Sequence, residues 1–228
     1  MKDLTSIDSD SDFSKSILAV IEEHRPTKLI ETGTYLGTGT TALIASAIKN
    51  LEIENAKFYS IEVSPSNCAE ASLNIFNRGL SDYVEILNGL SISRDQLLNR
   101  GMISKLFIEK DWPDHVYIDH LVKNRVENYY SETNFPKVED NLLVKCIELF
   151  ENRPDFVLLD SGGHVGSEEF DIFIHNVKGP CILVLDDIHH VKHYNSMKRI
   201  IEDPRFRLIK MAREKFGFCI TKFNSGAQ

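Results

Sequence analysis

The sequence predicts an α/β fold: a Rossmann-like, doubly wound parallel sheet closed by a C-terminal antiparallel hairpin. The first observation is that short apolar strands alternate with amphipathic helices, which is typical of parallel sheets covered by helices on both faces. The second is a pair of strand-like runs near the C-terminus, Phe206–Met211 and Phe216–Lys222, joined only by Ala212–Lys215. No helix fits into this connection, so we expect the two runs to pair antiparallel.

The remaining elements are expected in alternating order before this hairpin. Apolar periodicity, a proline in a first turn and an Arg-Pro helix end predict the helices. They are expected at Phe13–His24, Thr40–Ile48, Pro65–Arg78 and Asn141–Glu151. Parallel strands are expected at Lys28–Glu31, Lys57–Glu62, Tyr83–Leu87, Phe156–Asp160 and Cys181–Asp186. The last two strands are apolar up to their final residues, as expected of strands buried on both faces of a sheet.

The domain organisation follows from length and composition. The 228 residues suffice for one large domain, expected at 13–228, preceded by a flexible Ser- and Asp-rich N-terminus at 1–12. Within the domain, the aromatic-rich stretch 101–140 is far longer than one crossover helix needs, and long connections of this kind are uncommon in compact domains. We expect an insertion that either covers the site as a lid or forms the interface of a homodimer.

Composition disfavours several classes of function. The chain has a formal net charge of −8, whereas a general nucleic-acid binder carries an excess of basic residues, so no nucleic-acid partner is expected. No apolar run reaches transmembrane length, and the polar N-terminus lacks the apolar core of a signal peptide, so we expect no membrane partner and a cytoplasmic location. The four cysteines form no C-x-x-C pair, which disfavours a thiolate metal site.

The strongest functional signal is the Gly/Thr-rich loop after the first predicted strand. Glycines 33, 37 and 39 follow Glu31, and glycine lets a ligand approach the backbone closely. A second acidic residue, Glu62, ends the second strand, where it could accept both ribose hydroxyls of a nucleoside. The spacing is G-x-x-x-G-x-G rather than the G-x-G-x-x-G of dinucleotide enzymes. Glu31 suits the cationic amine and sulfonium of S-adenosylmethionine, which has no phosphate.

These features resemble the first two motifs of class I S-adenosylmethionine-dependent methyltransferases, particularly the small-molecule O-methyltransferase branch. The resemblance covers the chain from about Leu29 to Phe223, apart from the insertion. It implies contacts to the methionine part from the glycine loop, to the ribose from Glu62 and to the adenine from the turn after the third strand. The cofactor-binding residues so expected are Glu31, Gly33, Thr34, Gly37, Glu62, Asn88 and Ser91. The alternative is that the glycines only form a tight strand–helix turn.

Three further carboxylates follow the fourth and fifth strands: Asp160, Asp186 and Asp187. Carboxylates that converge at one sheet edge need a proton or a cation between them, and Mg²⁺ prefers oxygen ligands. The pattern resembles catechol O-methyltransferases, which bind Mg²⁺ through an Asp after the fourth strand and an Asp-Asn pair after the fifth. Asp187 stands where that family has Asn, and an Asp-Asp pair resembles tailoring methyltransferases of sugars and antibiotics. In the alternative, Asp187 caps the next helix and Asp160 binds backbone amides of the following turn.

The expected chemistry is methyl transfer to a hydroxyl of a small molecule, such as a sugar or a natural-product intermediate. The sulfonium is already the electrophile, so the protein must position and deprotonate the acceptor. A metal near Asp160 would lower the pKa of the hydroxyl. Without a metal, a general base is needed, and His164 and His189 are the best placed. The alternatives are a non-catalytic cofactor-binding or interaction protein and a nicotinamide-dependent oxidoreductase.

Overall fold

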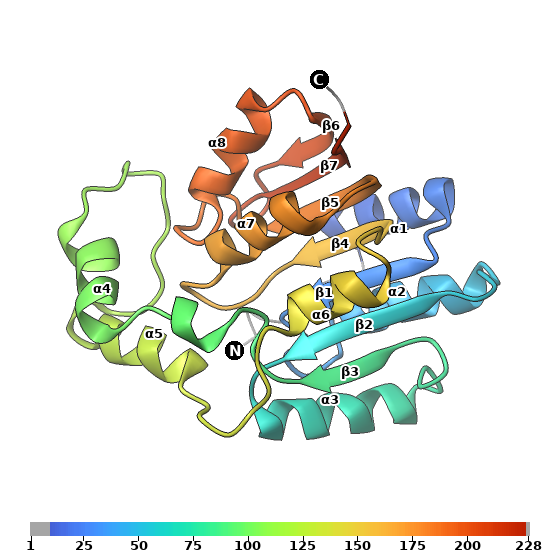
Figure 1. Ribbon diagram of the computed structural model, residues 1–228, viewed down its shortest axis with the longest axis horizontal. Coiled ribbons are helices and arrows are strands. Elements are labelled where there is room, and N and C mark those ends of the chain that lie inside the picture. Colours follow the sequence, from blue (N-terminus) through green and yellow to red (C-terminus); the bar gives the residue numbers. More distant parts are fainter. Residues whose placement is uncertain (1–9, 227–228) are drawn as a thin grey trace.

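A computed structural model describes residues 10–226, which form a seven-stranded sheet between two layers of helices (Figure 1). The strand order is β3-β2-β1-β4-β5-β7-β6. Strands β1 to β5 are parallel, whereas β7 is antiparallel to both of its neighbours. The strands are β1 (Lys28–Thr32), β2 (Lys57–Glu62), β3 (Glu85–Asn88), β4 (Phe156–Leu159), β5 (Pro180–Asp186), β6 (Phe206–Ala212) and β7 (Phe218–Asn224). The predicted fold class is confirmed.

The C-terminal hairpin is confirmed with shifted boundaries. The predicted connection Ala212–Lys215 is displaced, because β6 extends to Ala212 and β7 begins only at Phe218. Gly217, with φ +77, lies in the turn between them. The second strand of the hairpin, not the first, pairs with β5, so the chain passes to the edge of the sheet and returns inward.

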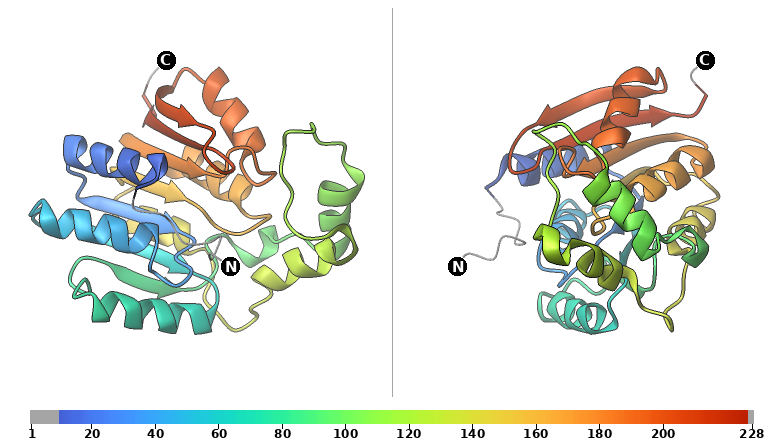
Figure 2. Two further views of the ribbon diagram at one scale, coloured as in Figure 1. Left: turned by 180° about the vertical axis from the view of Figure 1, so that it is seen from behind. Right: turned by 90° about the vertical axis from the view of Figure 1, so that its left-hand side faces the viewer.

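Helices cover both faces of the sheet, and each face has its own apolar core. Alternate residues of one strand point to opposite faces: Leu29 belongs to the core under α1, α2 and α3, and Ile30 to the core under α6, α7 and α8. Figure 1 shows α6 and α7 in front of the sheet, and the reverse view shows α1 and α2 (Figure 2). The helices are α1 (Asp12–His24), α2 (Thr40–Asn50), α3 (Pro65–Asn77), α6 (Leu142–Leu149), α7 (Gly166–Asn176) and α8 (Tyr194–Glu202).

The first helix begins within the segment expected to be flexible. Ser11 caps α1, since its Oγ accepts a hydrogen bond from the Ser14 backbone N–H at 3.0 Å. Asp12 is the first helical residue, and Lys210 of β6 binds its carboxylate at 2.5 Å. Residues 1–9 of the predicted flexible N-terminus lie outside the described residues.

The insertion 101–140 packs against the carboxyl end of the parallel sheet (Figure 2). It contains α4 (Arg100–Ser104), a π-helical turn (Lys105–Glu109) and α5 (Arg125–Thr133). Its small core includes the stacked rings of Phe107 and Tyr129, whose centroids are 4.4 Å apart. A Cβ at Gly163, in the loop after β4, would lie 2.1 Å from the Tyr129 ring, so the insertion is packed tightly onto this loop.

Within residues 10–226, no helix is both long enough and apolar enough to cross a bilayer.

Candidate functional site

The glycine loop after β1 is shaped by its approach to the end of β4. Gly33 has φ +87, and a Cβ there would lie 2.3 Å from the carbonyl oxygen of Asp160. Gly37 has φ +67 and packs on Ala71 of α3, 3.1 Å from its Cβ. Positive φ and close approach both demand glycine. The loop therefore makes the tight turn of the alternative reading, and its contact with a cofactor stays a prediction.

Glu31 is fully buried beneath this loop. Thr41 and Ser60 each donate a hydrogen bond to Glu31 Oε2 at 2.6 Å. Thr34 donates in turn to Ser60 at 2.6 Å, because the Ser60 hydroxyl proton is engaged with Glu31. Burial raises the pKa of Glu31 to about 7. Its second oxygen, Oε1, has no hydrogen-bond partner among residues 10–226, and a buried acceptor of this kind calls for a donor such as an ammonium group or a water molecule.

Glu62 lies at the end of β2 with both carboxylate oxygens engaged by backbone amides. Tyr35 N donates to Oε2 at 2.7 Å and Ser64 N to Oε1 at 2.9 Å. The Asn67 side chain also hydrogen-bonds to this carboxylate. A carboxylate has about four lone-pair sites, so the group retains capacity for one further donor. Burial raises the pKa of Glu62 above its ordinary value. Asn88, at the end of β3, donates to the carbonyl oxygen of Glu62 at 2.9 Å, so these two predicted residues lie side by side.

Ser91 lies apart from this pair and contacts a buried acid that the sequence analysis missed. Its side chain binds Glu169 of α7. Glu169 also accepts hydrogen bonds from Thr32 at 2.9 Å and from Ser161 at 2.5 Å. Ser91 therefore helps to tie β1, the β4 loop and α7 together beneath the site.

The three predicted metal-ligand carboxylates do come together. One oxygen each of Asp160, Asp186 and Asp187 lies within 4.8 Å of the others. Neither alternative assigned to them is seen: Asp187 caps no helix, because α8 begins at Tyr194 without a side-chain cap, and Asp160 is engaged by a side chain, as described next. The edge of the sheet is therefore a shared acidic site.

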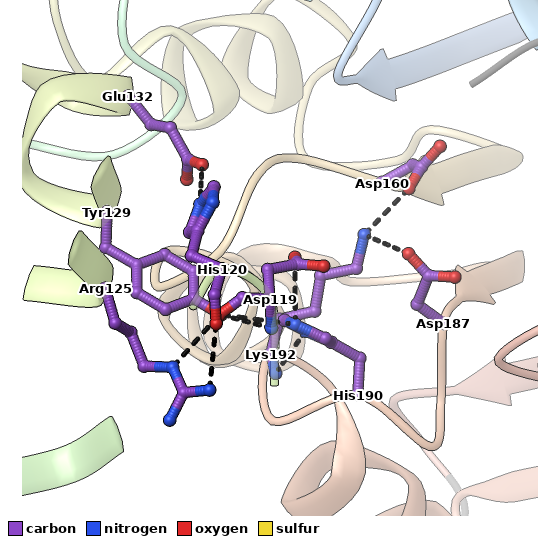
Figure 3. A network of polar contacts seen from close by, with 9 residues as sticks. All are labelled: Asp119, His120, Arg125, Tyr129, Glu132, Asp160, Asp187, His190 and Lys192. Atoms are coloured by element: carbon purple, nitrogen blue, oxygen red, sulfur yellow. Dashed lines mark hydrogen bonds and ion pairs between the residues drawn. The ribbon is translucent and has the colours of Figure 1, made fainter. Parts of the chain in front are cut away.

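Lys192, which the sequence analysis missed, lies in the centre of this acidic site (Figure 3). Its ammonium nitrogen is 2.8 Å from Asp160 Oδ1 and 2.9 Å from Asp187 Oδ2. Although burial acts to lower it, the carboxylates of Asp160 and Asp187 raise the pKa of Lys192 well above its ordinary value. Burial and the neighbouring charges of Asp160 and Asp187 raise the pKa of Asp186 well above the ordinary value of an aspartate. The site thus holds a charged ammonium between two carboxylates.

A divalent ion fits the oxygen donors of this site but not the ammonium. Two unit charges about 4 Å apart interact by about 4 kcal/mol at an effective dielectric constant of about 20. An Mg²⁺ ion bound to Asp160 and Asp187 would meet a repulsion from Lys192 of roughly twice that size. The three carboxylates offer the oxygen ligands that Mg²⁺ prefers, whereas the ammonium of Lys192 beside them opposes its binding, and the predicted Mg²⁺ site stays a prediction.

The two predicted histidines have different environments. His164 is buried against the insertion, with Nε2 3.5 Å from Thr133 Oγ1, and burial lowers its pKa to about 4. A general base works best when its pKa is near the working pH, so His164 is poorly suited to that role. His189 is half-buried, and burial, Arg213 and His115 lower its pKa less strongly.

His189 lines a groove of about 820 Å³ next to the acidic site. The rings of Tyr117 and Phe216 stack there with centroids 4.1 Å apart. Tyr117 comes from the insertion and Phe216 from the hairpin turn, while Lys215 in the same wall acts electrostatically on Asp160. Aromatic walls with a few polar groups are typical of small-molecule sites.

The insertion is bonded directly to the loop between β5 and α8. Tyr117 N donates to His189 O at 2.7 Å, and Val191 N donates to Tyr117 O at 3.1 Å. His190 Nδ1 accepts from Lys192 N, which leaves Nε2 to donate to Asp119 Oδ2 at 3.0 Å. Figure 3 shows His190 and Asp119 of this network beside Lys192. The same loop therefore carries Asp187, His189 and Lys192 and anchors the insertion.

Comparison with known proteins places this arrangement in a known fold. No protein-family model matches the chain. The structure is similar to the O-methyltransferase from Bacillus cereus in complex with S-adenosylhomocysteine (15% identity, 94% of this chain and 82% of that chain, TM-score 0.57). It is also similar to the O-methyltransferase of tomaymycin synthesis from Streptomyces achromogenes, in complex with S-adenosylmethionine (12%, 93% and 79%, TM-score 0.55).

A methyltransferase from Geobacter sulfurreducens is similar over 97% of this chain and 82% of its own, at 12% identity and a TM-score of 0.56. The chain therefore has the fold of class I S-adenosylmethionine-dependent methyltransferases, as its sequence predicts.

Proposed function

We propose that the protein transfers a methyl group from S-adenosylmethionine to a hydroxyl group of a small molecule. The observation that carries this proposal is the contact between Gly33 and the backbone of Asp160. It brings the expected cofactor loop directly against the acidic site, so a methyl donor on one and an acceptor at the other would be neighbours. The solved structures of this fold named above, two of them with S-adenosylhomocysteine or S-adenosylmethionine bound, support the cofactor.

The cofactor would be held by groups that have unused hydrogen-bonding capacity. The unpartnered Oε1 of Glu31 suits the cofactor amine, with Gly33 and Gly37 leaving room for the methionine part. The remaining lone pair of Glu62 suits a ribose hydroxyl. Asn88 holds the end of β2 beside the nucleoside, whereas Thr34 and Ser91 act through Ser60 and Glu169.

The acceptor would lie in the groove beside His189, with its hydroxyl directed to Asp160. Bound S-adenosylmethionine would supply the methyl group on its sulfonium, and its transfer to the hydroxyl oxygen would release S-adenosylhomocysteine. His189 is the residue we assign to take the hydroxyl proton, since it is partly exposed in the groove wall. A sugar or a natural-product intermediate is an acceptor of suitable size for this groove. The homodimer and the cytoplasmic location stay predictions.

The test is a methyl-transfer assay with labelled S-adenosylmethionine and a panel of hydroxylated sugars and phenols. Label recovered on an oxygen atom, with one S-adenosylhomocysteine formed per transfer, supports the proposal. Binding of S-adenosylhomocysteine without transfer to any acceptor favours the cofactor-binding interaction protein. Binding of NAD in its place favours the oxidoreductase. Parallel reactions with EDTA and with Mg²⁺ separate metal-assisted from metal-free transfer.

A further inference from the structure

We propose that the ammonium group of Lys192 is a built-in cation that takes the place of a divalent metal in the acidic site. The inference rests on the proposed function for its role in methyl transfer, but the geometry concerns the residues of this chain alone. It assigns Lys192 as a positioning residue that holds Asp160 and Asp187 and makes the site independent of added metal.

The first support is the position of the ammonium group. Lys192 Nζ lies at 2.8 Å from Asp160 and 2.9 Å from Asp187, so it bridges two of the three carboxylates that would bind an ion. The Lys192 side chain is only 5% exposed, whereas Asp160 is 22% and Asp187 26% exposed. The cation therefore lies beneath the carboxylates, and their outer sides remain open to an acceptor.

The second support is that the backbone holds Lys192 in this position. Its N–H donates to His190 Nδ1 at 3.1 Å, and the preceding N–H, of Val191, is bound by Tyr117. On the other side, a Cβ at Gly166 would lie 3.1 Å from Lys192 Cβ. The start of the side chain is thus confined by α7 and by the insertion, and the ammonium has little freedom to leave the carboxylates.

The third support is the balance of charge. A metal bound by Asp160, Asp186 and Asp187 would share two of its carboxylates with Lys192, which is already paired with Asp160 and Asp187, and buried charges require such pairing. With the ammonium in place, two carboxylates are paired to one fixed cation. No metal then lowers the pKa of the acceptor hydroxyl, so a protein base such as His189 must remove its proton.

The test measures Mn²⁺ binding by electron paramagnetic resonance in the wild type and in Lys192→Met, which keeps the side-chain length without the charge. We expect no specific Mn²⁺ binding by the wild type. Lys192→Met should bind Mn²⁺ at least about tenfold more tightly, because the repelling charge is gone. The added substitution Asp160→Asn should abolish the gained site. Lys192→Gln serves as a second uncharged variant, and circular dichroism verifies the fold of each.

Two results would overturn the inference. One is tight Mn²⁺ binding by the wild type that Asp160→Asn removes. The other is folded Lys192→Met and Lys192→Gln proteins that gain no Mn²⁺ site. Neither readout depends on methyl transfer, so a failure of the proposed function would leave this result interpretable. In a wild type that is active, transfer should proceed at the same rate with EDTA as with Mg²⁺.

Discussion

The two halves of the site, one beneath the glycine loop and one beside the insertion, are built in different ways. On the cofactor side, the groups that bind Glu31 and Glu62 all belong to one stretch of chain, residues 31–67. On the acceptor side, Asp160 and Lys192 follow two different strands, and Asp119 reaches His190 from the insertion. The first half is therefore built from one continuous stretch, whereas the second joins the ends of β4 and β5 to the insertion.

The two halves also differ in whether their polar groups already have partners within the protein. The cofactor side presents unused acceptors, Glu31 Oε1 and the remaining lone pair of Glu62, to a ligand that supplies the donors. On the acceptor side, Asp160 and Asp187 are already paired with Lys192. We infer that the cofactor half is completed by its ligand, whereas the acceptor half is complete in the protein alone.

The largest effect is expected where the two halves touch. Gly33→Ala should destabilise the protein by roughly 2–5 kcal/mol, since positive φ and overlap with a neighbouring group add together. The new Cβ would lie 2.3 Å from the Asp160 carbonyl oxygen. Urea denaturation gives the change in the free energy of unfolding, and calorimetry should show loss of S-adenosylhomocysteine binding.

Gly79→Ala is the matched control for this substitution. Gly79 also has positive φ, +64, but a Cβ there would meet only Lys49 Nζ, at 3.8 Å. Its cost should be confined to the backbone term of about 1–2 kcal/mol, with cofactor binding unchanged. Equal losses in the two variants would show that the contact between loop and acidic site is unimportant.

A somewhat smaller effect is expected from Glu31→Gln in the cofactor half. With a folded-state pKa of about 7 and an ordinary value of 4.5, Glu31 binds a proton more readily in the folded than in the unfolded state. Its stabilising contribution is present below pH 4.5 and is lost as the pH rises through 7. The full loss is of the order of 3 kcal/mol.

Glu31→Gln should therefore be more stable than the wild type at pH 8 and similar at pH 4.5, since the amide oxygen can still accept from Thr41 and Ser60. Thermal unfolding at the two pH values measures this difference. The same variant should bind S-adenosylhomocysteine more weakly, because a neutral amide attracts the cofactor amine less. A variant that is destabilised equally at both pH values would contradict the assigned pKa.

The smallest effect is expected within the acceptor half, from His164→Asn. Its burial and its pKa of about 4 make it a weak base at neutral pH, so kcat should change by less than about threefold. His189→Asn, in the groove wall, should lower kcat by about 100-fold or more. Steady-state kinetics on an acceptor identified by the transfer assay distinguish the two, and a large loss for His164→Asn would reverse the assignment.

The sequence predicted the sheet, the hairpin and the acidic strand ends because apolar periodicity and strand ends are local patterns. It also predicted that Asp160, Asp186 and Asp187 would meet, since parallel strands end at one edge. The ion pair of Lys192 with Asp160 was not predicted, because Asp160 follows another strand and only the fold brings the two residues together. A lysine in the loop directly after the Asp186–Asp187 pair is the signal that could have indicated it.

The buried position of His164 could not be predicted either, because it depends on how the insertion packs. Tyr129 lies over Gly163, and Thr133 meets His164. Both contacts join the insertion to the loop after β4, and the pattern of apolar residues along the sequence does not say how these two segments pack. The boundaries of β7 differ for a similar reason: its pairing with β5 sets the register, not the hairpin turn.

The most direct test of the central claim is calorimetric titration of the wild type and of Glu62→Ala with S-adenosylhomocysteine. We predict micromolar binding by the wild type. Glu62→Ala should weaken it by about 1–3 kcal/mol, the usual effect of removing a buried acceptor from its donors. Failure of the wild type to bind S-adenosylhomocysteine would contradict the assignment of this site to the cofactor.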